Sequence, residues 1–221
     1  MDRAKIFGIG LSKTATTSLN GALETLGICS THGVMDLLEW QGSPLISILC
    51  VVANRIAATF HRELLFIRPL LYSFGENSFN FDDLAEYESV SDLPIGLYYP
   101  EIDKLYPGSK FILTLRDEDE WIASARHHFD GKKANQTIHT WNKMRLQVYG
   151  CIIFDEDKFR ATYRNHVQSV REYFKDRPDD LLEVNLCKES DWKPICEFLG
   201  FEIPAKSFPH KNKTASDEVK I

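Results

Sequence analysis

The chain has 221 residues, of which 43% are hydrophobic, and its formal net charge is −6 at pH 7. A chain of this length can bury a core of its own, so a soluble α/β domain needs neither disulfides nor a metal for stability. The negative charge excludes broad attraction to nucleic acid or anionic lipid, so any phosphate site must be built from local cations.

Cysteine usage and the N-terminus point to a cytoplasmic protein. The five cysteines are scattered along the chain without a C-x-x-C pair, which favours free thiols in a reducing compartment over a disulfide framework or zinc site. No charged segment with an apolar core precedes the first predicted strand, so we expect no signal peptide. The most apolar stretch, residues 44–53, is too short to span a bilayer.

The first predicted element is a strand, loop and helix between Lys5 and Gly27. An apolar run is followed by Gly8 and Gly10, which permit a tight turn, and Gly27 ends the helix. The loop and the first helical turn contain Lys13 and four hydroxyl residues within the next five positions. Free N–H groups, the helix dipole and these side chains suit an anion, although an ordinary N-capped helix would have similar residues.

The next part of the chain is less informative. We predict a strand over Ile28–His32, a helix over Val34–Trp40, a loop over Glu76–Phe81 and a short helix over Asp82–Glu88. Residues 45–74 are predicted to form one or two helices, with apolar residues on nearly every face. They either pack in a core or form an acceptor-pocket cover or partner surface.

Two strands with charged ends follow. One ends at Asp92, and the continuous apolar run Lys110–Leu115, typical of a buried parallel strand, ends at Arg116. The remaining predicted elements are helices over Ile95–Tyr106, Glu118–Phe129, Asn135–Tyr149 and Asp157–Lys175, a strand over Leu181–Leu186, and a helix from Trp192 that Gly200 ends.

Alternating strands and helices predict a mainly parallel β-sheet with helices on both faces and ligands at the carboxyl ends of its strands. Lys13, Asp92 and Arg116 then lie at the same edge. The guanidinium of Arg116 and the hydroxyl of Ser124 could converge on one phosphate. Alternatively, Arg116 pairs with Asp117 or Glu120, Ser124 is a solvated helix position, and Asp92 caps the next helix.

Two segments resemble the sulfotransferases that use 3′-phosphoadenosine 5′-phosphosulfate (PAPS). The stretch Gly10-Leu-Ser-Lys13-Thr-Ala-Thr16-Thr17-Ser18-Leu19 is similar to their 5′-phosphosulfate loop. It departs from the triphosphate-binding pattern G-x-x-x-x-G-K-[ST], because Ser12 precedes Lys13. The stretch Lys110 to Ser124 resembles their 3′-phosphate segment, in which Arg and Ser have the same seven residues between them.

Later segments, including Trp192–Gly200 and Phe208-Pro209-His210-x-Asn212, are similar to a compact sulfotransferase-like branch. The match covers nearly the whole chain and is poor over residues 40–85. The resemblance implies one domain over residues 1–221, with a P-loop nucleotide-kinase-like three-layer architecture. A helical insertion at about residues 34–85 would form the acceptor pocket.

The resemblance also implies roles for individual residues. Lys13 would neutralise the leaving group, Asp92 would be the general base, and Arg116 and Ser124 would hold the 3′-phosphate. The 5′-phosphate would be held by Ser12, Lys13, Thr14, Ala15, Thr16, Thr17 and Ser18. Lys211 and Lys213 are further candidate ligands of the cofactor, although lysines are common on any protein surface.

His61 is the alternative base, because the phenol and steroid sulfotransferases use histidine. The expected reaction converts PAPS to 3′-phosphoadenosine 5′-phosphate (PAP) and sulfates a hydroxyl or amine of a small molecule, without a metal.

Two rival functions remain open from the sequence. A small-molecule kinase or nucleoside triphosphatase is disfavoured by the missing glycine before Lys13 and by the arginine before Asp117. A nucleotide-binding protein without catalysis would act through a partner, with residues 45–74 as a partner or weak membrane-surface contact. We expect no transmembrane segment and no nucleic-acid partner, and a homodimer is left open.

Overall fold

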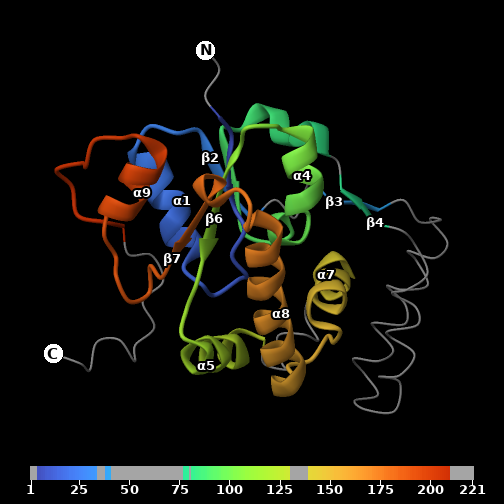
Figure 1. Ribbon diagram of the computed structural model, residues 1–221. Coiled ribbons are helices and arrows are strands. Elements are labelled where there is room, and N and C mark those ends of the chain that lie inside the picture. Colours follow the sequence, from blue (N-terminus) through green and yellow to red (C-terminus); the bar gives the residue numbers. More distant parts are fainter. Residues whose placement is uncertain (1–3, 34–37, 41–76, 80, 130–138, 210–221) are drawn as a thin grey trace, which may run out of the picture. The chain divides into compact units, whose positions relative to one another are not determined.

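The computed structural model describes residues 4–33, 38–40, 77–79, 81–129 and 139–209 (Figure 1). Contacts divide the chain into two compact units. Unit 1 comprises Met1–Val34, Leu84–Trp121 and Asn165–Ile221, and unit 2 comprises Met35–Asp83 and Ile122–Arg164. The prediction of one domain with an insertion at residues 34–85 stays a prediction, since most of that insertion lies outside the described residues.

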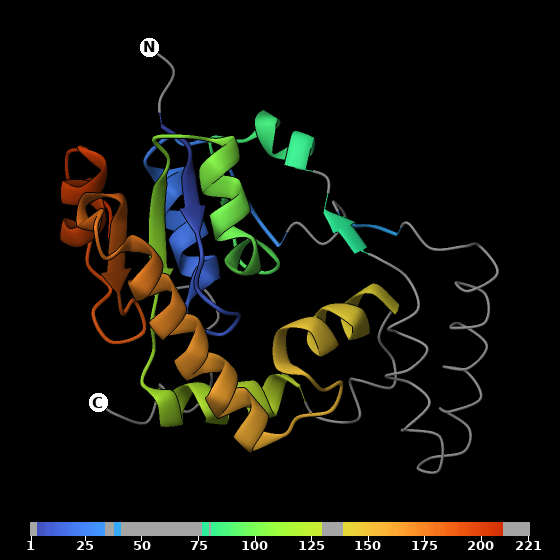
Figure 2. The same ribbon diagram turned by 45° about the vertical axis from the view of Figure 1, so that its right-hand side comes forward.

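Unit 1 is built on a five-stranded parallel sheet in the order β2-β5-β1-β6-β7. Figure 2 shows β1 and β6 side by side, running in the same direction. The sheet confirms the predicted α/β fold class and puts all the carboxyl ends at one edge. The bounds are β1 (Ile6–Gly8), β2 (Ser30–His32), β5 (Ser89–Ser91), β6 (Lys110–Thr114) and β7 (Leu181–Val184).

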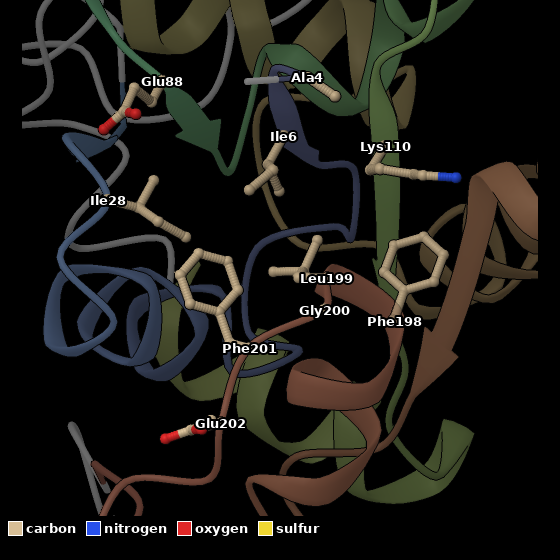
Figure 3. A pocket seen from close by; sticks show the side chains of 10 residues that line it. All are labelled: Ala4, Ile6, Ile28, Glu88, Lys110, Phe198, Leu199, Gly200, Phe201 and Glu202. Atoms are coloured by element: carbon tan, nitrogen blue, oxygen red, sulfur yellow. The ribbon is translucent and has the colours of Figure 1, made fainter. Parts of the chain in front are cut away.

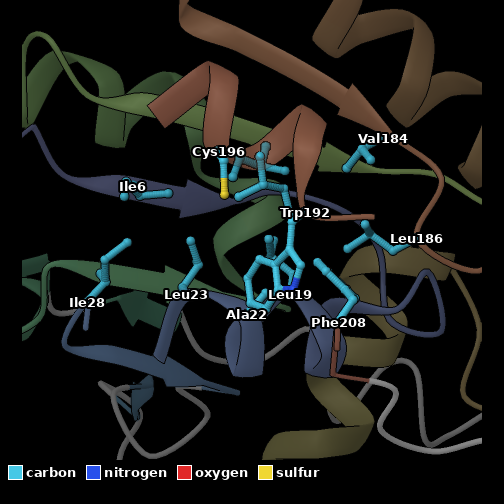
Figure 4. Close-up of a cluster of buried hydrophobic side chains, with 12 residues drawn as sticks. Ile6, Leu19, Ala22, Leu23, Ile28, Val184, Leu186, Trp192, Cys196 and Phe208 are labelled. Atoms are coloured by element: carbon cyan, nitrogen blue, oxygen red, sulfur yellow. The ribbon is translucent and has the colours of Figure 1, made fainter. Parts of the chain in front are cut away.

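Helices α1 (Thr16–Thr25) and α9 (Lys193–Leu199) cover one face of this sheet (Figure 1). Figure 4 shows the buried cluster beneath them, in which Ile6 of β1 meets Leu19 and Leu23 of α1. Trp192 closes the cluster, because its ring lies 4.9 Å from that of Phe208 and its Nε1 donates a hydrogen bond of 2.6 Å to the Lys206 carbonyl. The segment after α9 is thereby tied to the core.

Aromatic side chains cover the opposite face, where α4 (Tyr99–Leu105) and the last part of α8 (Glu156–Phe174) pack. Phe7 and Phe111 lie 5.7 Å apart between ring centroids, and Phe111 lies 4.9 Å from Phe174. Neighbouring residues of a strand point to opposite faces of the sheet, so Ile6 and Phe7 pack in different hydrophobic clusters. Helices therefore cover both faces of the sheet, as predicted.

In unit 2 the predicted helix over Val34–Trp40 is wrong at its described end. Leu38–Trp40 forms strand β3, which pairs antiparallel with β4 (Asn77–Phe79), so the predicted loop over Glu76–Phe81 is also wrong there. The partner strand comes from far along the chain, so local periodicity could not reveal the pairing. The apolar segment 45–74 lies outside the described residues.

Three predicted helices are confirmed over their described parts, namely α5 (Glu118–His128), α7 (His139–Tyr149) and α8. Within unit 2, Tyr149 and Phe159 stack with ring centroids 4.0 Å apart, and Phe129 meets both rings edge-on. In the described part of the chain, no helix is long and apolar enough to cross a membrane. Short 3-10 helices are η2 (Phe81–Glu86), η3 (Ile95–Leu97) and η4 (Pro178–Asp180).

Candidate functional site

The loop between β1 and α1 has an unusual backbone. Lys13 and Ala15 have φ of 77° and 70°, in the left-handed region that side chains other than glycine rarely adopt. The N-cap of α1 is Ala15, which makes no side-chain cap hydrogen bond, so the alternative of an ordinary helix capped by Thr or Ser is wrong. Left-handed residues before a helix are typical of backbone nests, in which successive N–H groups face one anion.

Close packing against β6 fixes the start of this loop. A Cβ atom on Gly10 would lie 1.9 Å from Thr114 Oγ1, so only glycine fits there. The Thr14 hydroxyl lies 2.7 Å from that of Thr114 and donates to the Leu11 carbonyl at 2.6 Å. Thr14 is fully buried and its hydroxyl helps to hold the loop in shape, so its part in binding a phosphate stays a prediction.

Two distant side chains hold the loop through its carbonyl groups. The indole Nε1 of Trp121 donates to the Ser12 carbonyl at 2.9 Å, and His166 Nε2 lies 2.7 Å from the Ile9 carbonyl. A carbonyl can only accept, so His166 carries a proton on Nε2. Burial lowers the pKa of His166, which keeps the ring neutral.

Asp92 points at the same loop. It follows β5 with φ 77°, and its Oδ1 accepts a hydrogen bond of 2.8 Å from the Ser12 hydroxyl. The next helical turn is capped by Pro94 without a side-chain bond, so the alternative that Asp92 is an N-cap is wrong. A strained backbone that aims a carboxylate at a neighbouring loop is often found at functional sites.

His32 also belongs to this constellation, and the sequence did not single it out. It ends β2, in register with Ser91 of β5. Its Nε2 lies 3.5 Å from Asp92 Oδ2, and 3.1 and 3.2 Å from the hydroxyls of Thr16 and Thr17. The one available signal was its position at the end of a predicted strand, which says nothing about the neighbouring strand.

Arg116 lies at the carboxyl edge, as predicted, after β6. Its Nε is 3.5 Å from Glu120 Oε2, so the predicted ion pair with Glu120 is present. Asp117 instead caps α5, because its Oδ1 accepts hydrogen bonds from the N–H groups of Asp119 and Glu120. Ser124 lies partly exposed in α5, and its convergence with Arg116 stays a prediction. Lys211, Lys213 and the alternative base His61 lie outside the described residues.

A hollow of about 380 Å³ in unit 1 lies at the other edge of the sheet (Figure 3). Its walls include Ile6 and Lys110, which begin β1 and β6, together with Phe198 and Phe201. Lys110 Nζ donates a hydrogen bond of 2.7 Å to the Asp179 carbonyl, so this ammonium group already has a partner within the protein. This mainly apolar hollow is therefore separate from the loop.

The residues at the carboxyl edge combine two chemical abilities. N–H groups, hydroxyls and Lys13 can stabilise negative charge, and the Asp92 carboxylate can take a proton. Among the described residues, no three His, Cys, Asp or Glu side chains are grouped to hold a metal ion. The arrangement suits transfer of an anionic group to a nucleophile that loses a proton.

Comparisons with known proteins agree with this chemistry. A family model described as "Sulfotransferase domain" matches residues 5–216. The chain is also similar to Ava biosynthesis cluster protein M of Aspergillus versicolor, with 30% identity over 233 aligned residues that cover 93% of this chain and 80% of that protein.

We predict that His166 makes the fold less stable in acid. Burial lowers its pKa below the usual 6.5, so the unfolded chain binds the proton more readily. Stability should therefore fall as the pH drops below 6.5, by at most about 1.4 kcal/mol per pH unit, until the pKa of the folded state is reached. Urea unfolding at several pH values measures this slope.

His166→Gln should flatten that slope, because glutamine does not titrate but can still donate to the Ile9 carbonyl. The exposed His127 provides the control, and His127→Gln should keep the parent slope. An unchanged slope in His166→Gln would show that other groups cause the acid sensitivity.

Proposed function

Because the chain belongs to the sulfotransferase domain family, we propose that it transfers a sulfuryl group from PAPS to a hydroxyl or amine of a small-molecule acceptor. One observation carries the proposal. The loop similar to a phosphosulfate loop and the candidate base are hydrogen-bonded to each other, through the Ser12 hydroxyl and Asp92 Oδ1 at 2.8 Å. An acceptor that loses its proton to Asp92 would then lie beside the anion it attacks.

The proposed step is an in-line displacement at sulfur. The acceptor oxygen forms a bond to sulfur as the bond between sulfur and the bridging phosphate oxygen breaks, and PAP leaves with added negative charge. Lys13 and N–H groups at the junction of the loop and α1 would stabilise that charge, which is usually the largest contribution to catalysis. The acceptor proton goes to Asp92.

Recognition of the nucleotide would use a second cation. A guanidinium can donate two parallel hydrogen bonds to one phosphate, so Arg116 is the proposed ligand of the 3′-phosphate. The family resemblance adds Ser124, and Lys211 and Lys213 are further proposed ligands.

Other features bear on the acceptor and the cell compartment. The name of the Aspergillus versicolor relative refers to a biosynthesis cluster, which is compatible with a small-molecule acceptor. Residues 34–85 are the proposed acceptor pocket. The free thiols of Cys29, Cys151 and Cys196 support the proposed cytoplasmic location.

We predict that PAP stabilises the protein without a metal. At a concentration of 100 times its Kd, a ligand adds about 2.7 kcal/mol to the free energy of unfolding. For a chain of this size the melting temperature should rise by about 5–10 °C. Scanning calorimetry with PAP, and separately with ATP and Mg²⁺, measures the shift. A shift with ATP and Mg²⁺ alone would favour a kinase or nucleoside triphosphatase, and no shift with millimolar PAP would refute PAPS use.

Arg116→Ala should selectively weaken the binding of nucleotides that carry a 3′-phosphate. Loss of the charge-assisted hydrogen bonds should raise the Kd of PAP about 10- to 100-fold, whereas adenosine 5′-phosphosulfate should bind almost as before. Titration calorimetry measures both affinities. Glu120→Ala is the matched control, since it removes the same ion pair but keeps the guanidinium. Equal losses for both nucleotides would mean that Arg116 has a structural role.

Asp92→Asn should separate catalysis from binding. Asparagine can still accept the hydrogen bond from Ser12 and tolerates a positive φ, so the fold and PAP affinity should be almost unchanged. Sulfate transfer from PAPS, measured by mass spectrometry over a panel of hydroxyl compounds, should fall about 100-fold or more. Asp176→Asn, at an exposed position, serves as the control. Transfer at the parent rate would make Asp92 dispensable and direct attention to His61.

A further inference from the structure

The imidazole of His32 connects the two halves of the candidate site. Its Nε2 lies 3.5 Å from Asp92 Oδ2, and 3.1 and 3.2 Å from Thr16 Oγ1 and Thr17 Oγ1. These oxygens belong to different elements, because Asp92 follows β5 whereas the two threonines form the first turn of α1. One nitrogen atom therefore faces both the proposed base and the proposed anion-binding turn.

A single nitrogen cannot bond equally to all three oxygens. Nε2 has either one proton to donate or one lone pair to accept with, whereas a threonine hydroxyl can do both. The distances to Thr16 and Thr17 are within hydrogen-bond range, but 3.5 Å to Asp92 is longer than a good hydrogen bond. In this arrangement Nε2 is bonded to the threonine hydroxyls and lies next to the carboxylate.

Packing alone does not account for His32. Its Nε2 lies close to three polar oxygens and its side chain is 26% exposed, so His32 is not a core residue. His166 provides the contrast, since its ring is mostly buried and its Nε2 is committed to one carbonyl.

We propose that His32 is a positioning residue that prepares Asp92 when the phosphate loop is occupied. This inference rests on the proposed function. The oxygens of a bound 5′-phosphosulfate would accept the hydroxyl hydrogens of Thr16 and Thr17, which then no longer bond to Nε2. While Nε2 accepts from the threonines, the neutral ring carries its proton on Nδ1. Once the threonines turn to the ligand, the partly exposed ring would exchange through solvent to the tautomer with its proton on Nε2, and this N–H would donate to Asp92 Oδ2 while Ser12 donates to Oδ1.

The consequence is a carboxylate held at both oxygens. Each carboxylate oxygen has two lone pairs, so one hydrogen bond on each leaves room for the proton of the acceptor. His32 forms no covalent bond and need not touch the acceptor. Its contribution is orientation, and the base becomes fully ordered only beside a bound sulfuryl donor.

Nitrogen NMR of the histidine rings tests this coupling without an acceptor. In protein with ¹⁵N-labelled histidine, PAP should shift the His32 signals toward the form with its proton on Nε2. The His166 signals should not change, because the Ile9 carbonyl fixes that proton. In Asp92→Asn the PAP-induced change at His32 should be smaller, since the carboxylate that attracts the proton is gone.

Calorimetric titration of the same samples separates the outcomes. If PAP binds and the His32 signals stay unchanged, the inference about His32 is overturned while the proposed function stands. If PAP does not bind, both are overturned.

Turnover gives a second readout. His32→Ala should lower the rate of sulfate transfer by about 10- to 100-fold, the scale of a misplaced catalytic group, with the Kd of PAP changed less than about threefold. His32→Gln, which keeps a hydrogen-bonding end, should recover part of the rate, and exposed His127→Ala should match the parent.

The double variant then shows whether His32 acts through Asp92. In the Asp92→Asn background, His32→Ala should cost little further rate, because residues that act as a unit are not additive. The positioning role would be refuted if the rate of the double variant fell by the product of the two single-variant factors. It would also be refuted if His32→Ala lowered PAP affinity as much as it lowered turnover, because His32 would then be an independent anion ligand.

Discussion

The tight attachment of the β1–α1 loop to the sheet is the constraint on which the site depends. Left-handed backbone at a residue other than glycine costs about 1–2 kcal/mol, and this loop contains it at Lys13 and Ala15. Such a conformation persists only where the surroundings hold it. Here the surroundings are Thr114 at the end of β6, Trp121 of α5 and His166 of α8, which bond to the loop from three parts of the chain. The core is therefore what keeps the N–H groups of the loop in place.

The order of the strands arranges the chemistry along the carboxyl edge. From β2 through β5 and β1 to β6, the strand ends present His32, then Asp92, then the loop with Lys13, and finally Arg116. The proposed proton acceptor therefore lies on one side of the proposed anion-binding loop, and the proposed 3′-phosphate ligand follows the strand on its other side. Under the proposed function, the two phosphate-bearing ends of PAPS would lie along this row of strand ends, with the transferred group nearest to Asp92.

Much of this arrangement could be predicted from the chain itself. The apolar runs of β1 and β6, the glycines that end α1 and α9, and the charged residues after β1, β5 and β6 are local patterns, and the structure confirms the elements they predict. The strand pair β3–β4 was missed, since its hydrogen bonds join Leu38 to Phe79 across a long stretch of chain. The burial of Thr14 was not foreseen, because hydroxyl residues in a loop look alike until the tertiary structure distinguishes them.

The sequence by itself determined that a loop with lysine and hydroxyl residues, an acidic strand end and an arginine strand end belong to one α/β sheet, because these features depend on neighbours in the chain. Only the tertiary structure decided that His32 faces Asp92. That contact requires β2 to lie directly beside β5, and strand order is set by packing between segments about 60 residues apart, as a parallel crossover allows many orders for the same local pattern. The left-handed backbone at Asp92, which aims its carboxylate at Ser12, likewise follows from long-range contacts.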